Sequence, residues 1–328
     1  MTHPPFDPEL SAALAAVADR IPPTLTPADI QRQRERMSEV RLTDDDLGRD
    51  GRIAYEEREV PGPAGAPALS LLICRPARVA TPAPGVYHTH GGGMILGDNR
   101  TGLAGSLDWI EALGVIVVSV QYRLAPEHPY PAAVEDCYAG LVWTAAHAAE
   151  LGVDPGRLVI AGTSAGGGLA AAVALMARDR GGPALIGQVL MCPMLDDRNE
   201  TPSSHELEGE GVWDRTSNRT GWTSLLGEAC GGGTVSPYAA PAREQNLSGL
   251  PPAFIDVGSA EVFRDEDVDY AVRMWRAGGQ AELHVWPGGF HGFDGLAPDA
   301  TLSRAARQAR IAWLGRLLGG ADRPGGSR

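Results

Sequence analysis

The sequence predicts an α/β protein built on a mostly parallel, doubly wound sheet of eight strands. From residue 53 onward, short apolar runs that are typical of buried strands alternate with longer stretches of helical periodicity. The first two runs, 53–60 and 68–74, flank a Gly/Pro/Ala-rich linker at residues 61–67, which predicts a hairpin. An antiparallel start followed by alternating strands and helices favours a sheet with helices on both faces.

The remaining elements follow from the same patterns, in chain order. Further strands are predicted at residues 85–90, 115–120, 158–161, 185–192, 253–257 and 281–285. Helices are predicted at residues 132–149, 167–179, 265–277 and 299–318. The chain end, residues 319–328, is expected to be a disordered tail.

Two segments stand outside this alternation of strands and helices. Residues 1–50 carry helix signals of their own, at residues 8–20 and again after Thr26, where Pro27 suits the first position of a helix. Residues 199–233 form a polar stretch that glycines punctuate. The predicted core therefore comes in two parts, residues 51–198 and residues 234–318.

Ser164 is the candidate nucleophile, at the centre of the sequence G-T-S-A-G at residues 162–166. An apolar run precedes this pentapeptide and an alanine-rich helical stretch follows it, as expected for a nucleophile elbow. Small residues flank the serine because the chain turns sharply there from strand to helix, and a bulky side chain would collide with neighbouring strands. A lone G-x-S-x-G is a weak signal in a chain with 42 glycines.

A second motif strengthens the first. His90 begins the sequence H-G-G-G at the end of another predicted strand. Its three glycines let the backbone pass close to a substrate carbonyl with N–H groups turned inward. His291 lies in a Gly/Pro-rich loop after the strand predicted at 281–285, where it can reach a serine on another loop as a general base.

Four segments together resemble the hormone-sensitive-lipase-like branch of the α/β-hydrolases, the bacterial family IV carboxylesterases. They are HGGG at 90–93, YRLAPEHPYP at 122–131, GTSAGG at 162–167 and FHGF at 290–293. The resemblance implies an α/β-hydrolase fold in which residues 1–50 and 199–233 form a helical cap over Ser164. Thr163 departs from the commoner aspartate at that position, which indicates a sub-branch.

The acid of a catalytic triad has more than one candidate. The family's Asp-Pro-Leu-Arg-Asp-Glu segment corresponds here to EVFRDE at 261–266, so the resemblance implies Glu261. This residue also follows the strand predicted at 253–257, at the sheet edge where active-site groups gather. The alternatives are Asp196 and Asp197, which follow an earlier strand, and Asp265, which otherwise suits the start of a helix.

These roles define an expected mechanism and site. His291 takes the proton of Ser164 as the serine attacks an ester carbonyl, and Glu261 holds the imidazole. The N–H groups of three residues are expected to bind the resulting oxyanion: Gly92, Gly93 and Ala165. Apolar residues expected near the substrate are Met94, Leu96, Trp213 and Phe290. Neither a cofactor nor a metal is expected, because the four cysteines are widely spaced without a C-x-x-C pair.

Three functions compete at this point. The first is a serine carboxylesterase for short- to medium-chain esters, with a small pocket under the cap. The second is amide hydrolysis or acyl transfer on the same triad. The third is a non-catalytic receptor for a small ligand, against which the presence of His291 weighs, because receptors of this architecture lack the histidine.

The composition of the chain limits the kinds of partner that it can bind. A net charge of −13 argues against binding to nucleic acid and to anionic membrane surfaces. The N-terminal residues show no basic-then-apolar signal pattern and no apolar run reaches membrane-spanning length, so a cytoplasmic location is expected. A small ester is the expected partner, and exposed sheet edges allow a homodimer without requiring one.

Overall fold

The structure is a computed structural model that describes residues 2–78 and 82–320. Its strands are β1 Ile53–Val60, β2 Leu69–Pro76, β3 Ala83–Thr89, β4 Ile116–Gln121, β5 Val153–Thr163, β6 Gly187–Met191, β7 Ala253–Gly258 and β8 Ala281–Trp286. They form one sheet of eight strands in the order β1-β2-β4-β3-β5-β6-β7-β8. Strand β2 pairs antiparallel with β1 and β4, and all the other pairs are parallel. The predicted fold class is confirmed.

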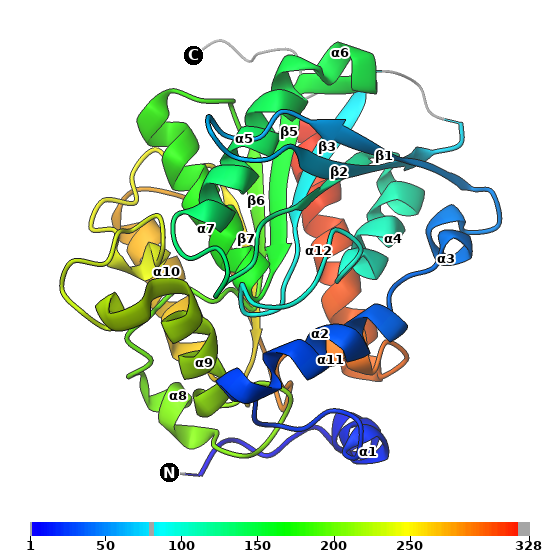
Figure 1. Cartoon of the computed structure of the whole chain (residues 1–328). Helices are drawn as coiled ribbons and strands as arrows, with labels where there is room; N and C mark the ends of the chain where they lie inside the picture. Colours follow the sequence, from blue (N-terminus) through cyan, green and yellow to red (C-terminus); the bar gives the residue numbers. More distant parts are fainter. Residues whose placement is uncertain (1, 79–81, 321–328) are drawn as a thin grey trace.

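Helices cover both faces of the sheet (Figure 1). They are α1 Pro8–Val17, α2 Ile30–Glu39, α3 Asp44–Gly48, α4 Leu103–Leu113, α5 Ala132–Ala146, α6 Ala148–Leu151, α7 Ala165–Arg180, α8 Pro202–Glu206, α9 Arg215–Leu226, α10 Arg264–Arg276, α11 Phe293–Leu296 and α12 Thr301–Gly320. Short 3-10 turns lie at Pro27–Asp29, Gly227–Ala229 and Pro241–Arg243. Helices α5, α7 and α10 share one apolar core with the sheet, while α4 and α12 share the core on the other face.

The central strands are largely buried, because both of their faces pack against helices. Every residue of β6 and β7 is buried, and so is every residue of β4 except the last, Gln121. Buried on both faces, these strands read as continuous apolar runs without alternation, which is why their positions can be predicted from the sequence. Among their few polar residues is His88, whose Nδ1 lies 3.0 Å from the Ser119 hydroxyl and whose pKa burial lowers to about 3.

Several element boundaries differ from the prediction. Strand β5 begins five residues before the predicted residue 158, because Val153 pairs with Ala83 ahead of a register shift in the β3–β5 ladder. The helix predicted at 132–149 is divided at His147 into α5 and α6. Helix α12 continues through Gly320, into the predicted tail, and residues 321–328 lie outside the described residues.

Most of the two segments expected to form a cap gathers at one end of the sheet, whereas α3, also within residues 1–50, packs against β1. Helices α1, α2, α8 and α9 lie together at the lower end in Figure 1. Hydrogen bonds join the two segments: the Leu25 N–H donates to the Ser217 hydroxyl at 2.8 Å, and the Thr220 hydroxyl donates to the Leu25 carbonyl at 2.8 Å. Within the two described ranges, no helix combines the length and the apolar character needed to cross a membrane.

Candidate active site

Ser164 lies at a sharp turn between β5 and α7, in a backbone conformation that L-residues rarely adopt, with φ 59° and ψ −124°. The flanking glycines make this turn possible. A Cβ on Gly162 would collide with the Gly166 backbone, and a Cβ on Gly166 would collide with the backbone of Thr89 and His90. The strain at the serine is therefore held in place by close backbone packing on both sides. This is the local geometry of a nucleophile elbow.

Three side chains from three loops form an unbroken hydrogen-bond chain. Nε2 of His291 lies 2.9 Å from the Ser164 hydroxyl oxygen, and Nδ1 of the same ring lies 2.9 Å from Oε1 of Glu261. The serine follows β5, the glutamate follows β7 and the histidine follows β8, so the parallel sheet brings the loops together at its carboxyl edge. All three residues are buried, with 6%, 8% and 1% exposure for Ser164, His291 and Glu261.

The Glu261 carboxylate is oriented by a second contact. Its Oε2 accepts the Gly258 N–H at 2.9 Å, which leaves Oε1 directed at His291. The ring of Phe263 packs edge-on against the imidazole, with centroids 5.1 Å apart. A carboxylate fixed on one side by the backbone can hold a histidine in one tautomer and one orientation.

The alternative acids are engaged elsewhere. Asp197 pairs with Arg243 through both carboxylate oxygens, and Asp196 pairs in the same way with Arg198. Asp265 accepts the backbone N–H of Ser203. Each of these carboxylates therefore has a structural partner, and the carboxylate hydrogen-bonded to His291 is that of Glu261.

The glycine loop after β3 comes close to the nucleophile. A Cβ on Gly91 would lie 3.4 Å from Cβ of Ser164. Gly92 and Gly93 have φ values of 113° and 61°, and the Gly92 carbonyl accepts the N–H groups of Ile95 and Leu96, which closes a tight turn. Within the described part of the chain, the N–H groups of Gly92, Gly93 and Ala165 have no intramolecular acceptor. These amides are thus available to a bound group.

His90 supports the glycine loop. Its ring stacks on Tyr122 with centroids 4.0 Å apart, its Nδ1 lies 2.8 Å from the Gly91 carbonyl, and the Tyr122 hydroxyl donates to the His90 carbonyl at 2.8 Å. Burial lowers the pKa of His90 to about 4, so the ring stays neutral near pH 7. A neutral ring that is held by stacking and by a hydrogen bond can keep the glycine loop in place.

Arg34 is a residue that sequence reasoning missed. It extends from α2, in the N-terminal segment, and its Nε donates to the Ile95 carbonyl at 2.8 Å. Its Nη2 donates to the Ala125 carbonyl at 2.8 Å, and the guanidinium pairs with Glu127, whose pKa it lowers to about 2. One side chain thus ties the cap segment to the glycine loop. No pattern near residue 34 signals a contact with residue 95.

A cavity of about 230 Å³ opens over Ser164 and His291. Of the residues predicted to contact substrate, Leu96 and Trp213 line it. Met94 and Phe290 do not: Met94 is buried in the main core, and Phe290 packs with Leu10 in a separate cluster. The expectation for these two residues is therefore corrected. Adjacency to the motifs places their backbones near the site while their side chains point into the protein interior.

The N-terminal segment supplies much of the cavity wall. Its contributions are Ile21, Pro22, Leu25, Gln33 and Met37. Sequence reasoning missed these residues, because neither spacing nor motif connects them with Ser164. The resemblance to the family predicts only that a cap exists, and it does not indicate which cap residues face Ser164.

Gly93→Ala is expected to lower kcat about 100-fold, because a misplacement of about 1 Å at an active site has an effect of that size. A Cβ at residue 93 would lie 2.8 Å from Cζ2 of Trp213, so the loop and its amide must shift. Gly114→Ala is the matched control: φ is also positive, at 68°, but its Cβ would meet no atom within 4 Å. Equal losses of kcat in the two variants would show that backbone strain, and not the amide position, causes the effect.

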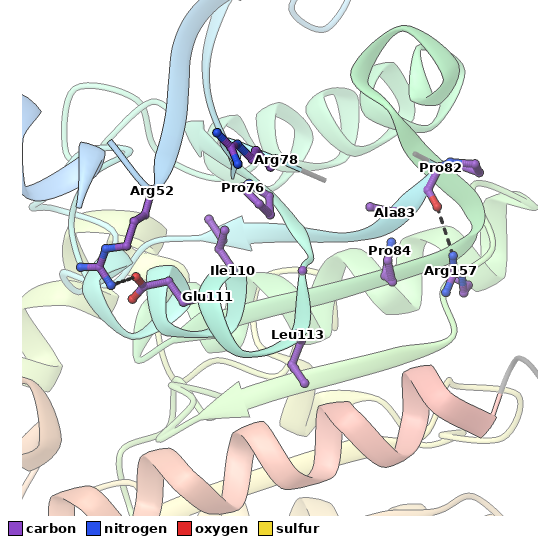
Figure 2. Close-up of a pocket in the computed structure, with 11 residues that line it drawn as sticks. Arg52, Pro76, Arg78, Pro82, Ala83, Pro84, Ile110, Glu111, Leu113 and Arg157 are labelled. Atoms are coloured by element: carbon purple, nitrogen blue, oxygen red, sulfur yellow. Dashed lines mark hydrogen bonds and ion pairs between the residues drawn. The ribbon is translucent and has the colours of Figure 1, made fainter. Parts of the chain in front are cut away.

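A larger hollow lies far from these residues. A cavity of about 700 Å³ is located at the amino ends of β3, β4 and β5, whereas Ser164 follows the carboxyl end of β5. Figure 2 shows its side chains, including Arg52 paired with Glu111 and Arg157 directed at the Pro82 carbonyl. The described residues that line it include no serine, cysteine or histidine. Size alone does not identify the site.

The chain is similar to known proteins over almost all of its length. The alpha/beta hydrolase fold family matches residues 86–295. Carboxylesterase NlhH of Mycobacterium tuberculosis is 36% identical over 322 residues, which cover 97% of this chain and 99% of that protein. Among solved structures, a bacterial heroin esterase has a TM-score of 0.86 at 36% identity, covering 95% of this chain and 98% of that chain. Esterase LipW from Mycobacterium marinum also has a TM-score of 0.86 at 36% identity, covering 96% and 98%.

Proposed function

The chain belongs to the hormone-sensitive-lipase-like carboxylesterases of the α/β-hydrolase family, and from this premise we propose that Ser164, His291 and Glu261 are its catalytic triad. The single observation that carries the proposal is the hydrogen-bond chain from the serine hydroxyl to the carboxylate, with both links 2.9 Å long. Ser164 and His291 line a cavity, through which an ester can reach the serine.

The reaction follows from this arrangement. Nε2 of His291 takes the proton of Ser164 as the serine oxygen attacks the ester carbonyl carbon. Glu261 stabilises the imidazolium that forms and does not itself become protonated. The protonated histidine then gives its proton to the departing alcohol, which leaves an acyl group on Ser164. Water attacks the acyl-enzyme with His291 again as the base, and the acid product is released.

We assign the oxyanion hole to the N–H groups of Gly92, Gly93 and Ala165. Their lack of intramolecular acceptors in the described chain supports this assignment. Ala165 is the first residue of α7, so the positive end of that helix dipole faces the developing charge. Losing one such donor typically costs about 3–4 kcal/mol of transition-state stabilisation.

We propose that residues 1–50 and 199–233 are a cap that sets the substrate size. The hydrogen bonds between these segments and the contribution of both to the cavity wall support this division. A cavity of about 230 Å³ corresponds to roughly eight water volumes of about 30 Å³ each. Such a volume suits short to medium acyl chains and excludes long ones.

The experiment that tests this function is hydrolysis of p-nitrophenyl esters from acetate to palmitate. We expect the highest kcat/KM between acetate and octanoate, and a steep fall for longer chains because they exceed the cavity. Trp213→Ala serves as the matched variant, since removing this ring from the wall should move the optimum to longer chains. Highest activity on palmitate would contradict the size argument. Faster cleavage of the matching anilides would favour the amidase alternative.

A further inference from the structure

A free cysteine lies beside the proposed histidine–glutamate pair and takes no part in the proposed hydrolysis. Cys192 follows β6, is buried, and has a positive φ of 38°. Its Sγ, one ring nitrogen of His291 and one carboxylate oxygen of Glu261 all lie within 4.8 Å of one another. Three different donor atoms from three loops therefore converge on one point behind the nucleophile.

This donor set has the chemistry of a site for a borderline or soft divalent cation. Thiolate, imidazole and carboxylate are the ligands of protein zinc sites, with bond lengths of about 2.3 Å to sulfur and about 2.0–2.2 Å to nitrogen and oxygen. Tetrahedral bonds of those lengths separate the donor atoms by about 3.3–3.6 Å. The Nδ1–Oε1 distance is 2.9 Å, so this pair must open only slightly, and the thiol, which lies within 4.8 Å of its partners, must approach by about 1 Å at most.

The surroundings of the Cys192 thiol decide which of its forms can exist there. Burial raises the pKa of the Cys192 thiol well above its usual range, and the charges of Glu261, Asp294, Asp256 and Asp267 raise it further. Of these carboxylates, Asp256 and Asp294 are paired with Arg310. Burial penalises an isolated thiolate and an isolated cation alike, whereas a thiolate and a divalent cation bound together offset each other's charge.

A second cavity lies close to the three donors and next to the substrate cavity. Its volume is about 210 Å³, and it is lined by Met191 and Gly292, the chain neighbours of Cys192 and His291. Two acids, Asp108 and Asp294, also line it. It shares Gly102 and Thr163 with the substrate cavity. Cavities thus adjoin the segments that carry two of the three donors, and His291 itself lines the substrate cavity.

We propose that Cys192, Glu261 and His291 form an inhibitory site for a borderline or soft divalent cation of the class of Zn²⁺ and Cd²⁺, an inference that rests on the proposed triad. The cation binds the Nδ1 lone pair, so the proton that Nδ1 carried is lost to solvent and Nε2 gains one. The thiol releases its proton to water as it becomes a ligand. Nε2–H then faces Ser164 and cannot accept the serine proton, so hydrolysis stops.

Binding is tested with Cd²⁺ alone, on a protein that cannot turn over. Equilibrium dialysis of Ser164→Ala is expected to show one tightly held cation, with the ultraviolet charge-transfer absorption of a cadmium thiolate. In Ser164→Ala/Cys192→Ala the affinity should fall at least about tenfold and the absorption should disappear. Equal affinity in the two proteins would overturn the proposal. Because no hydrolysis is measured, this result is independent of whether the triad assignment holds.

Inhibition is tested on the active enzyme, with each variant compared with its own rate without metal. Cd²⁺ should inhibit the wild type reversibly, with recovery on chelation, and Cys192→Ala should need at least about tenfold more Cd²⁺ for half-inhibition. Cys230→Ala is the control, since this half-buried thiol lies near the Asp197 carbonyl, and it should keep wild-type sensitivity. Loss of sensitivity in Cys230→Ala instead would place the inhibitory cation elsewhere and overturn the proposal.

Discussion

Ser164→Ala is expected to lower kcat for p-nitrophenyl esters by about 10⁶-fold, the effect typical of removing a triad nucleophile. The variant keeps the amides of the glycine loop and the cavity, so a small residual rate from binding and oxyanion stabilisation should remain. Its KM should change little, because the side chain lost is small and contacts the substrate mainly in the reaction. Pre-steady-state kinetics with ester in excess should show no burst of p-nitrophenol, because no acyl-enzyme can form.

The matched control for this change is Ser38→Ala. Ser38 is an exposed serine near the end of α2, and its hydroxyl donates only to the Glu35 carbonyl. Its kcat is expected to equal that of the wild type. A Ser164→Ala enzyme that keeps more than about a tenth of the wild-type rate would refute the nucleophile assignment, since other triad enzymes lose far more.

The sequence predicts those parts of the molecule that depend on local rules. Strands buried on both faces are continuous apolar runs, so β4, β6 and β7 can be located without a structure. Ser164 is signalled by the small residues that its turn requires, and His291 by a loop at a strand end. In a parallel sheet such ends meet at one edge, so topology alone brings the two loops together.

What the sequence cannot predict depends on contacts between distant segments. Arg34 reaches the Ile95 carbonyl across 61 residues, and no periodicity encodes that distance. The Cys192 thiol lies within 4.8 Å of a ring nitrogen of His291 for the same kind of reason, because the loops after two different strands lie close together at the sheet edge. Met94 and Phe290 show the opposite error: each adjoins a functional motif, but its side chain packs into a core. Backbone position can be inferred from a motif, whereas side-chain direction depends on packing.

Glu261→Gln is expected to lower kcat by about 10⁴-fold, the loss typical when the triad acid becomes an amide. The reason lies in the two contacts of the carboxylate. Both Oε2, facing the Gly258 N–H, and Oε1, facing His291 Nδ1, must be acceptors. An amide has one acceptor oxygen and one NH₂ donor. If its oxygen accepts the Gly258 N–H, its NH₂ group faces His291, so Nδ1 must become the acceptor. The ring proton then lies on Nε2, which can no longer accept the proton of Ser164.

Asp197→Asn provides the control that separates this chemistry from general damage to a buried acid. Asp197 has a fully buried side chain and binds both Arg243 and the Gly231 N–H, so its neutralisation should cost about 1.5–3 kcal/mol of unfolding free energy. Its kcat in folded protein should remain close to wild type, because none of these partners touches His291. Glu261→Gln should show the reverse pattern, with a large loss of kcat and a smaller loss of stability. If the two variants exchange these patterns, the acid of the triad is Asp197 and not Glu261, since loss of the residue that fixes the histidine tautomer lowers turnover without unfolding the protein.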